Sequence, residues 1–289
     1  MDVLQGDWYR IYNGDCVEAM RSMDAASVDM VLTSPPYNTC REHTIAECKD
    51  RPKEFYACRY DVHVESKTAE EYAVWTVELF NEFDRLLRKD GVVLYNYGMG
   101  NDSQSDSSAD NWFRTMNAVI DGTPFTCADL LFWKKRCALP DNISPNHSTR
   151  IAEPVMVLCR KSEARTFRAN KKVSSVRSTG QKMYVPFLNV IDAANNDGSN
   201  PLNKATYSTE LCDRLMEMYL PDDHGPDYTV LDPFNGTGTT GVSCQKRGVR
   251  YVGAELSEAQ CQYTVDRLEK GLAYVVEKSK GNGVTDVLF

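Results

Sequence analysis

The sequence predicts an α/β protein built around a largely parallel β-sheet. Segments typical of strands alternate with segments typical of helices at both ends of the chain, and such alternation favours parallel strands joined by helical crossovers. One predicted strand stops at a Pro-Pro turn, and another leads through a glycine-rich turn into a helix. Both turns therefore stand at the carboxyl ends of strands, where open α/β sheets bind ligands.

The first 160 residues contain the first group of alternating elements. A strand and turn at 8–15 and a helical turn at 17–23 precede an apolar strand at 28–33. That strand ends at Pro35-Pro36 because proline has no N–H group with which to continue a ladder. The other elements expected here are an amphipathic helix at 68–88, strands at 91–98, 128–135 and 153–161, and a helix at 111–120.

The rest of the chain is predicted to form a second compact group. Two polar stretches at 101–109 and 195–200 are rich in Ser, Asp, Asn and Gly, so we expect loops there. The elements that follow the second loop are a helix at 208–220, a strand and glycine-rich turn at 228–241, a helix at 240–248, a strand at 251–256 and a helix at 257–272.

The composition is that of an ordinary soluble globular protein. The chain has 289 residues, of which 42% are hydrophobic and 26% charged, and a formal net charge of −8 at pH 7. No apolar run approaches the roughly 20 residues that span a bilayer, and the first ten residues lack the basic and apolar regions of an export signal. The ten cysteines are widely scattered, which favours reduced thiols, so we expect a cytoplasmic protein.

We expect no metal site, although cysteines and histidines gather within 24 residues. None of these cysteines belongs to a C-x-x-C pair, the close spacing that structural zinc normally requires. The segment at 39–64 that contains them follows Tyr37 directly and is a candidate lid. The residues in question are Cys40, His43, Cys48, Cys58 and His63.

The glycine-rich turn at 232–241 is predicted to bind a nucleotide-like cofactor. Glycines let the backbone approach a ligand closely, and the N-terminus of the following helix offers unpaired N–H groups. Glu255 ends the next strand, 23 residues after Asp232, where a carboxylate can accept hydrogen bonds from ribose hydroxyls. The spacing suits an adenosine-containing cofactor. NAD stays an alternative, although only 48 residues follow Gly241, too few for the second half of a dinucleotide fold unless the earlier units supply it.

The Ser34-Pro35-Pro36-Tyr37 turn is the second candidate site. Its prolines fix the backbone and donate no N–H group, so the exposed polar groups are acceptors, namely the Ser34 hydroxyl and the carbonyls. An aromatic ring follows at once. Such a turn suits the capture of an exocyclic amino group on a planar base.

Together the two turns resemble the motifs of the amino-methyltransferases of DNA. In that family Ser-Pro-Pro-Tyr or Asp-Pro-Pro-Tyr is the catalytic motif, and Asp-Pro-Phe-x-Gly-x-Gly-Thr-Thr is the S-adenosylmethionine loop. The catalytic motif comes first here, so the chain resembles the β group, whose Rossmann-like methyltransferase fold is circularly permuted. The resemblance implies one domain with a catalytic half at 1–160, a target-recognition and DNA-contact region at 161–200, and a cofactor-binding half at 201–289.

The resemblance also implies roles for particular residues. Gly14-Asp15 matches an early Gly-Asp whose carboxylate approaches the adenine of the cofactor, and 150–161 resembles a later strand motif. The stretch 203–211 corresponds to His-Pro-Ala-x-Phe-Pro-x-Glu-Leu, with Asn203 and Ser208 in place of the usual His and Pro. The implied catalytic residues are Ser34, Pro35, Pro36 and Tyr37, and the implied cofactor-binding residues are Asp15, Lys204, Thr206, Asp232, Pro233, Phe234, Gly236, Gly238, Thr239, Thr240 and Glu255.

Basic side chains gather in the region expected to contact DNA. From Arg160 to Lys182, eight basic residues stand against Glu163 alone, a local net charge of +7 in an acidic protein. Such a stretch can neutralise phosphates, or it can be a solvated basic face. The residues expected to contact DNA are Asn38, Arg165, Arg168, Lys171, Lys172, Arg177 and Lys182.

The sequence therefore predicts a site-specific DNA methyltransferase of the restriction-modification kind. The base must be flipped out of the duplex, and Tyr37 is the ring expected to stack on it. The Ser34 side chain and the Pro35 carbonyl are expected to accept hydrogen bonds from the amino group. A serine at the first motif position favours cytosine N4; adenine N6 is the alternative, and an NAD-dependent oxidoreductase a more remote one. The expected partner is double-stranded DNA without a membrane, and the resemblance allows a homodimer and a cognate endonuclease.

Overall fold

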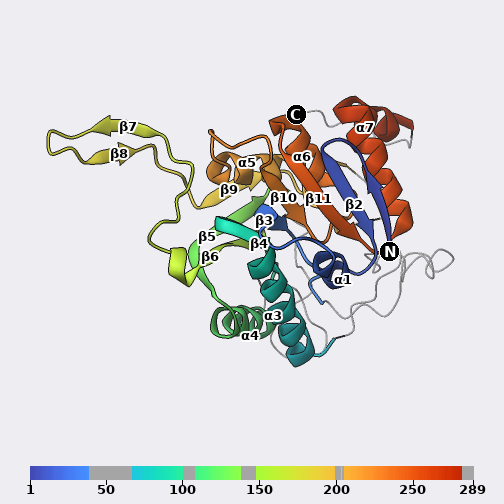
Figure 1. The fold of residues 1–289 in the computed structure, drawn as a ribbon, viewed down its shortest axis with the longest axis horizontal. Coiled ribbons are helices and arrows are strands. Elements are labelled where there is room, and N and C mark those ends of the chain that lie inside the picture. The colour runs from blue at the N-terminus through green and yellow to red at the C-terminus, as the bar shows by residue number, and fades with distance from the viewer. Residues whose placement is uncertain (39–66, 100–107, 138–147, 199–202, 204, 282–289) are drawn as a thin grey trace.

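The computed structural model describes the chain except for residues 39–66, 100–107, 138–147, 199–202, 204 and 282–289. Within the described residues, nine strands form one sheet in the order β1-β2-β11-β10-β3-β4-β6-β5-β9 (Figure 1). The strands are β1 (Asp2–Gln5), β2 (Tyr9–Asn13), β3 (Val28–Thr33), β4 (Leu87–Asn96), β5 (Phe125–Lys135), β6 (Ala152–Arg160), β9 (Val190–Ala193), β10 (Thr229–Asp232) and β11 (Arg250–Glu255).

The centre of the sheet is parallel. β2, β11, β10, β3 and β4 all run in the same direction, so their carboxyl ends share one edge. β6 runs antiparallel to both β4 and β5, and β1 runs antiparallel to β2. The predicted fold class, α/β with a mostly parallel sheet, is confirmed, and the permuted chain order places the strands of both halves side by side.

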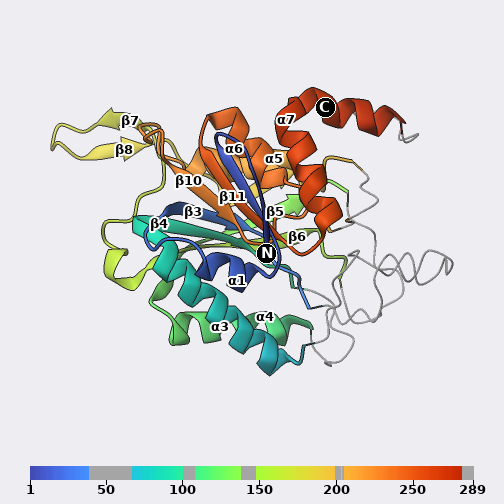
Figure 2. The same ribbon diagram turned by 45° about the vertical axis from the view of Figure 1, so that its right-hand side comes forward.

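Helices cover both faces of the sheet (Figure 2). One face carries α1 (Cys16–Arg21), α3 (Ala69–Leu86) and α4 (Ser108–Gly122), and the other carries α5 (Thr209–Tyr219), α6 (Thr239–Arg247) and α7 (Glu258–Gly281). The first layer packs around Phe80 and Phe83, and the second packs around Leu215 and Tyr251. Burial on both faces explains why the central strands are nearly continuous apolar runs.

α3 begins as the sequence predicts and ends two residues early. The Thr68 side chain accepts a hydrogen bond from the Glu71 backbone, and the Glu71 side chain accepts one from the Thr68 backbone, which completes a capping box. Leu87 has an extended backbone and pairs with Val28 of β3, so the chain enters β4 there. Pairing with a distant strand thus outweighs the helical periodicity that continues to Arg88.

Several strands escape the sequence prediction. The hairpin of β7 (Val173–Val176) and β8 (Lys182–Tyr184) projects far from the body of the molecule (Figure 1). β1 and β9, at the two edges of the sheet, were also not predicted. Each is only four residues long, and β1 and β7 are largely exposed, so their sequences lack the apolar alternation of a half-buried strand.

Two expectations concern residues outside those that the structure describes. The candidate lid at 39–64 and the cysteine and histidine cluster within it both lie there. Among the described residues, no cluster of His, Cys, Asp and Glu could hold a metal ion. No helix in the described part of the chain is long and apolar enough to cross a membrane.

Candidate active site

The two predicted turns lie next to each other at the carboxyl edge of the sheet. β3 ends at Thr33, β10 ends at Asp232, and the two strands pair in parallel. The Thr33 hydroxyl donates a hydrogen bond of 2.6 Å to Asp232 Oδ1, although the two residues are 199 positions apart in the chain. Neighbouring parallel strands therefore bring the Ser-Pro-Pro-Tyr turn and the glycine-rich turn to one place.

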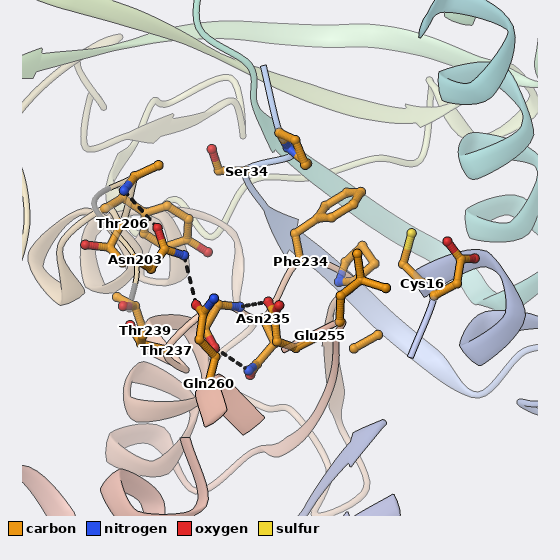
Figure 3. A pocket seen from close by; sticks show the side chains of 18 of the residues that line it. Cys16, Ser34, Asn203, Thr206, Phe234, Asn235, Thr237, Thr239, Glu255 and Gln260 are labelled. Carbon is orange, nitrogen blue, oxygen red and sulfur yellow. Dashed lines mark hydrogen bonds between the residues drawn. The ribbon is translucent and has the colours of Figure 1, made fainter. Parts of the chain in front are cut away.

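A pocket opens at this edge, with a lining drawn from both ends of the chain (Figure 3). The predicted residues that line it are Asp15, Ser34, Pro36, Thr206, Pro233, Phe234, Gly236, Thr239 and Glu255. Predicted residues that the structure places outside the lining are Pro35, Tyr37, Asp232, Gly238 and Thr240, and Lys204 is not among the described residues. Lining residues that were not predicted include Cys16, Lys67, Trp75, Asn203, Asn235 and Gln260.

The glycine-rich turn needs its glycines. Gly236 and Gly238 have φ angles of +53° and +78°, in the left-handed region that side chains disfavour. A Cβ atom on Gly238 would also lie 2.5 Å from Cγ2 of Thr264 in α7. Asn235 secures the turn by donating to Thr264 Oγ1 at 2.9 Å and accepting from the Tyr251 hydroxyl at 2.8 Å. The loop is thus held in an open shape against β11 and α7.

Two carboxylates reach the pocket from adjacent strand ends. Glu255 accepts hydrogen bonds from the backbone N–H groups of Gly236, at 2.9 Å, and Ser257, at 3.0 Å. Asp15 caps α1 through a single oxygen, which accepts from two backbone N–H groups. Both carboxylates line the pocket, and a carboxylate accepts hydrogen bonds from hydroxyl or amino groups of a ligand.

Asp232 lies behind the loop rather than in the pocket. Its side chain is 1% exposed and accepts hydrogen bonds from three hydroxyls and one backbone N–H group. Burial raises the pKa of this carboxyl group, and the hydrogen bonds only partly counter that effect. Asp232 therefore holds the loop in place through these hydrogen bonds. Its donors are the side chains of Thr33, Tyr207 and Thr240 and the N–H group of Phe234.

The segment before α5 supplies another wall of the pocket. Asn203, which stands where the family usually has His, donates to Gln260 Oε1 at 3.0 Å and accepts from the Ala205 N–H group at 2.8 Å. The Tyr207 hydroxyl donates to Asp232 at 3.0 Å. The sequence could not reveal Gln260 as a site residue, because its contact with Asn203 spans 57 positions of the chain. Tyr207 lies in the motif-like stretch 203–211, but its contact with Asp232, 25 positions away, could not be predicted.

Aromatic and apolar groups complete the pocket. The rings of Phe234 and Trp75 lie 5.7 Å apart, and Lys67 Nζ lies 5.3 Å from the centre of the Trp75 ring. Burial raises the pKa of the Cys16 thiol, which keeps it neutral near pH 7. Aromatic faces, two carboxylates and a glycine-opened backbone together fit an adenosine-containing cofactor.

Ser34 lines this pocket, and its hydroxyl belongs to a hydrogen-bond chain. Ser34 Oγ donates to the Tyr37 hydroxyl at 3.0 Å, and that hydroxyl lies 3.1 Å from both Asn96 Oδ1 and Glu153 Oε2. The Tyr37 ring packs edge-on against Tyr97, with ring centres 5.7 Å apart. Asn96 and Glu153 were not predicted. The only sequence signal of Asn96 is its position at the end of a strand, whereas Glu153 lies in the stretch 150–161 that resembles a strand motif of the family.

The residues predicted to contact DNA are spread widely and perform different local tasks. The Asn38 side-chain amide donates to the Lys67 carbonyl and accepts from the Lys67 N–H group, so these two residues lie next to each other. Lys172 forms an ion pair with Asp222, and Arg168 donates to backbone carbonyls nearby. The basic residues therefore lie along the chain that leads into the β7–β8 hairpin and, for Arg177 and Lys182, in the hairpin itself, whereas Asn38 lies apart from them.

Comparison with known proteins identifies relatives over nearly the whole chain. A family described as DNA methylase, of N6 and N4 methyltransferases, matches residues 28–266. The chain is 27% identical to the Type II methyltransferase M.Cfr9I of Citrobacter freundii, over 90% of this chain and 87% of that protein. It resembles the solved cytosine-N4-specific PvuII DNA methyltransferase with a TM-score of 0.68 and 17% identity, covering 96% and 94% of the two chains. It resembles the complex of M1.HpyAVI with S-adenosylmethionine with a TM-score of 0.51 and 16% identity, covering 90% and 98%.

The family match contains both turns of the site, Ser34–Tyr37 and the glycine-rich loop. It also decides between the cofactors that the glycine pattern left open, because this family takes its methyl group from S-adenosylmethionine. The chain belongs to the DNA methylase family of S-adenosylmethionine-dependent N6 and N4 methyltransferases.

Proposed function

We propose that this enzyme methylates N4 of cytosine in a specific sequence of double-stranded DNA, on a base flipped out of the helix. The observation that carries the proposal is the position of Ser34, a residue that lines the cofactor pocket together with Phe234. An acceptor there can bind an amino hydrogen of the base next to the cofactor. S-adenosylmethionine, when bound, supplies an activated methyl group.

The protein's own contribution is positioning and hydrogen bonding. Methyl transfer needs the attacking nitrogen, the methyl carbon and the sulfur nearly in line, so a fixed base orientation lowers the barrier. The lone pair of the amino group is delocalised into the base. Ser34 Oγ and the Pro35 carbonyl would accept hydrogen bonds from the amino hydrogens and localise that lone pair on nitrogen. The Tyr72 hydroxyl donates to the Pro36 carbonyl at 2.6 Å, which holds the turn rigid.

Tyr37 is proposed to stack on the flipped base. Phenylalanine at this position would keep the ring and lose only the hydroxyl, whereas alanine would lose both. A fluorescent base analogue at the target position should therefore report base flipping in Tyr37→Phe and weaker flipping in Tyr37→Ala. Equal signals from the two variants would mean that the ring has a structural role only.

Two observations favour cytosine over adenine. A serine stands first in the catalytic motif, which in this family leans towards cytosine N4. The chain also resembles a methyltransferase whose name specifies cytosine N4. Adenine N6 is the second candidate, because the family as a whole covers both amino groups.

The β7–β8 hairpin and the chain leading into it are proposed to contact DNA. No acidic residue occurs between Glu163 and Asp192, whereas the protein as a whole carries a net charge of −8. Arg160 and Lys161 are used inside the fold, by Asp84 and by backbone carbonyls. The remaining basic residues give the projecting arm a positive charge suited to phosphates. They are Arg165, Arg168, Lys171, Arg177 and Lys182, together with Lys172, whose charge is shared with Asp222.

The base is identified by product analysis. The purified enzyme is incubated with unmethylated plasmid DNA and isotopically labelled S-adenosylmethionine, and the DNA is digested to nucleosides for mass spectrometry. We expect labelled N4-methylcytosine. Labelled N6-methyladenine would mean that the same site methylates adenine instead of cytosine. The absence of any methylated nucleoside despite normal cofactor binding would contradict the proposal.

The remaining expectations stay predictions. A homodimer, a cognate restriction endonuclease and a cytoplasmic location agree with the Type II methyltransferase relative. Light scattering of the purified protein would give its oligomeric state directly.

A further inference from the structure

We infer that Glu153, held by Lys135, is a positioning residue that fixes the direction of the hydrogen bonds at Ser34. By setting the hydrogen of the Tyr37 hydroxyl, Glu153 makes Ser34 an acceptor towards the base. The inference rests on the proposed function, because it assumes that Ser34 accepts a hydrogen bond from the amino group. It gives a role to Lys135, which no motif singled out, and to Glu153, for which the strand motif at 150–161 implied no role.

Glu153 stands near the start of β6, beside Lys135 at the end of β5. One of its oxygens accepts a hydrogen bond from Lys135 Nζ, and the other lies 3.1 Å from the Tyr37 hydroxyl. The side chains of Glu153 and Lys135 are only 19% and 25% exposed. Lys135 Nζ also lies 4.9 Å from the centre of the Trp133 ring, which fixes the ammonium group from a second side. The Glu153 side chain is therefore held in a fixed orientation.

The direction of the chain follows from the donors and acceptors present. Asn96 Nδ2 donates to the Pro154 carbonyl at 3.1 Å, so its Oδ1 faces Tyr37 as an acceptor. The Glu153 carboxylate can also only accept. The single hydrogen of the Tyr37 hydroxyl must therefore point towards these two oxygens.

The same reasoning continues to Ser34. Because the hydrogen of the Tyr37 hydroxyl is committed, its oxygen accepts from Ser34 Oγ at 3.0 Å. The only hydrogen of Ser34 is then used as well, and the lone pairs of its oxygen are left to accept from the base. With the chain reversed, Ser34 would present a hydrogen to the amino nitrogen and engage the lone pair that must attack the methyl group. The direction of the chain thus decides whether Ser34 promotes or opposes the reaction.

The test is a double-mutant cycle between Glu153 and Tyr37. Glu153→Met removes the acceptor, Glu153→Gln keeps an amide oxygen, and Tyr37→Phe breaks the link to Ser34. The double variant Lys135→Met/Glu153→Met avoids an unpaired ammonium group. Lys134→Met is the matched control, because Lys134 neighbours Lys135 on β5 but pairs with exposed Asp192. The measurements are kcat on plasmid DNA, the Kd for S-adenosylmethionine and Tm.

We expect about a tenfold loss of kcat in Glu153→Met and in the double variant, with the cofactor Kd unchanged. Glu153→Gln should recover most of the activity, and Lys134→Met should behave as the parent enzyme. In the Tyr37→Phe background, Glu153→Met should change kcat by less than about twofold, because the link it acts through is already absent.

Two results would overturn the inference. One is an unchanged kcat in Glu153→Met, and the other is an equal loss with and without the Tyr37 hydroxyl, which would mean a general structural role. Ser34→Ala separates this failure from a failure of the proposed function. If Ser34→Ala loses turnover while Glu153→Met does not, only the role of Glu153 is wrong. If Ser34→Ala is also fully active, the proposed role of Ser34 falls as well.

Discussion

Asp232 and Gly238 lie at the start and in the middle of the cofactor motif, yet neither lines the pocket. The carboxylate of Asp232 is buried behind the loop and ties it to β3 and to the segment before α5. Gly238 turns the chain where a side chain would strike Thr264. Their predicted role in cofactor binding stays a prediction, and the geometry supports an indirect route in which both residues shape the loop.

Replacing Gly238 by alanine should weaken cofactor binding. The variant combines a left-handed φ of +78° with a contact of 2.5 Å to Thr264, so the loop must shift. Gly248 is the matched control, because its φ is +64° but an added Cβ would meet nothing within 4 Å. We expect both variants to lose about 1–3 kcal/mol of stability, and only Gly238→Ala to raise the Kd for S-adenosylmethionine. Isothermal titration and urea unfolding measure the two effects, and equal Kd values would contradict this account of the loop.

At the scale of elements, Asp213 of α5 links this helix to α6, the helix that follows the cofactor loop. Asp213 accepts hydrogen bonds from Lys246 at 2.8 Å and Arg247 at 2.7 Å. Burial alone would raise the pKa of Asp213, but hydrogen bonds from these residues and from Ser243 outweigh it, so the pKa is lowered. The ionised carboxylate therefore helps to hold α6 in place.

The lowered pKa predicts a pH-dependent contribution to stability. The stabilisation is fully present above the unfolded pKa, about 3.9, and is lost as the pH falls through the lower folded pKa. Asp213→Asn should cost about 1–2 kcal/mol at pH 7 and progressively less below about pH 4. Urea unfolding at pH 7 and pH 3 tests this. Asp223→Asn, in the loop after α5, is the control, and its free energy of unfolding should change little. A cost that is the same at pH 7 and pH 3 would show that ionisation of Asp213 is not its source.

The projecting hairpin predicts a salt-dependent contribution to DNA binding. Removing one basic side chain that binds a phosphate should flatten the slope of log K against log salt by about 0.9. Arg177→Ser/Lys182→Ser, near the hairpin turn, should therefore flatten the slope by up to about twice that amount. Arg114→Ser on α4 removes an exposed charge elsewhere and should leave the slope unchanged. Fluorescence anisotropy with a labelled duplex gives the slopes. Equal slopes for the hairpin variant and the parent would show that the hairpin does not contact DNA.

Prediction from sequence succeeded where elements carry their own periodicity and caps. The helix at 68–88 and the strand at 28–33 are of this kind, and the structure contains both. The edge strands and the hairpin could not be predicted, because they are short and are defined by pairing with distant residues. β9, for example, pairs with β5, whose residues lie more than 50 positions away.

At the scale of the whole molecule, the site forms because two strands far apart in the chain, β3 and β10, are neighbours in the sheet. Ser34 follows β3, the cofactor loop follows β10, and the sheet places these strands side by side. Both turns could be predicted because each is a short motif whose residues are consecutive or closely spaced in the sequence. The contacts of Glu153 and Asn96 could not be predicted, although Glu153 lies in the motif-like stretch 150–161, because both residues join the site through Tyr37, at separations of 116 and 59 positions.

The central claim is that Ser34 stands where the methyl group is transferred, and Ser34→Ala tests it most directly. Ser27→Ala is the matched control, because Ser27 precedes β3 at the opposite edge of the sheet while Ser34 follows it. The measurement is single-turnover methylation of plasmid DNA, together with the Kd for S-adenosylmethionine. The account predicts that Ser34→Ala loses turnover on the order of 30-fold, equivalent to about 2 kcal/mol, with an unchanged Kd, and that Ser27→Ala is fully active. Full turnover in Ser34→Ala, or a loss explained entirely by weaker cofactor binding, would contradict it.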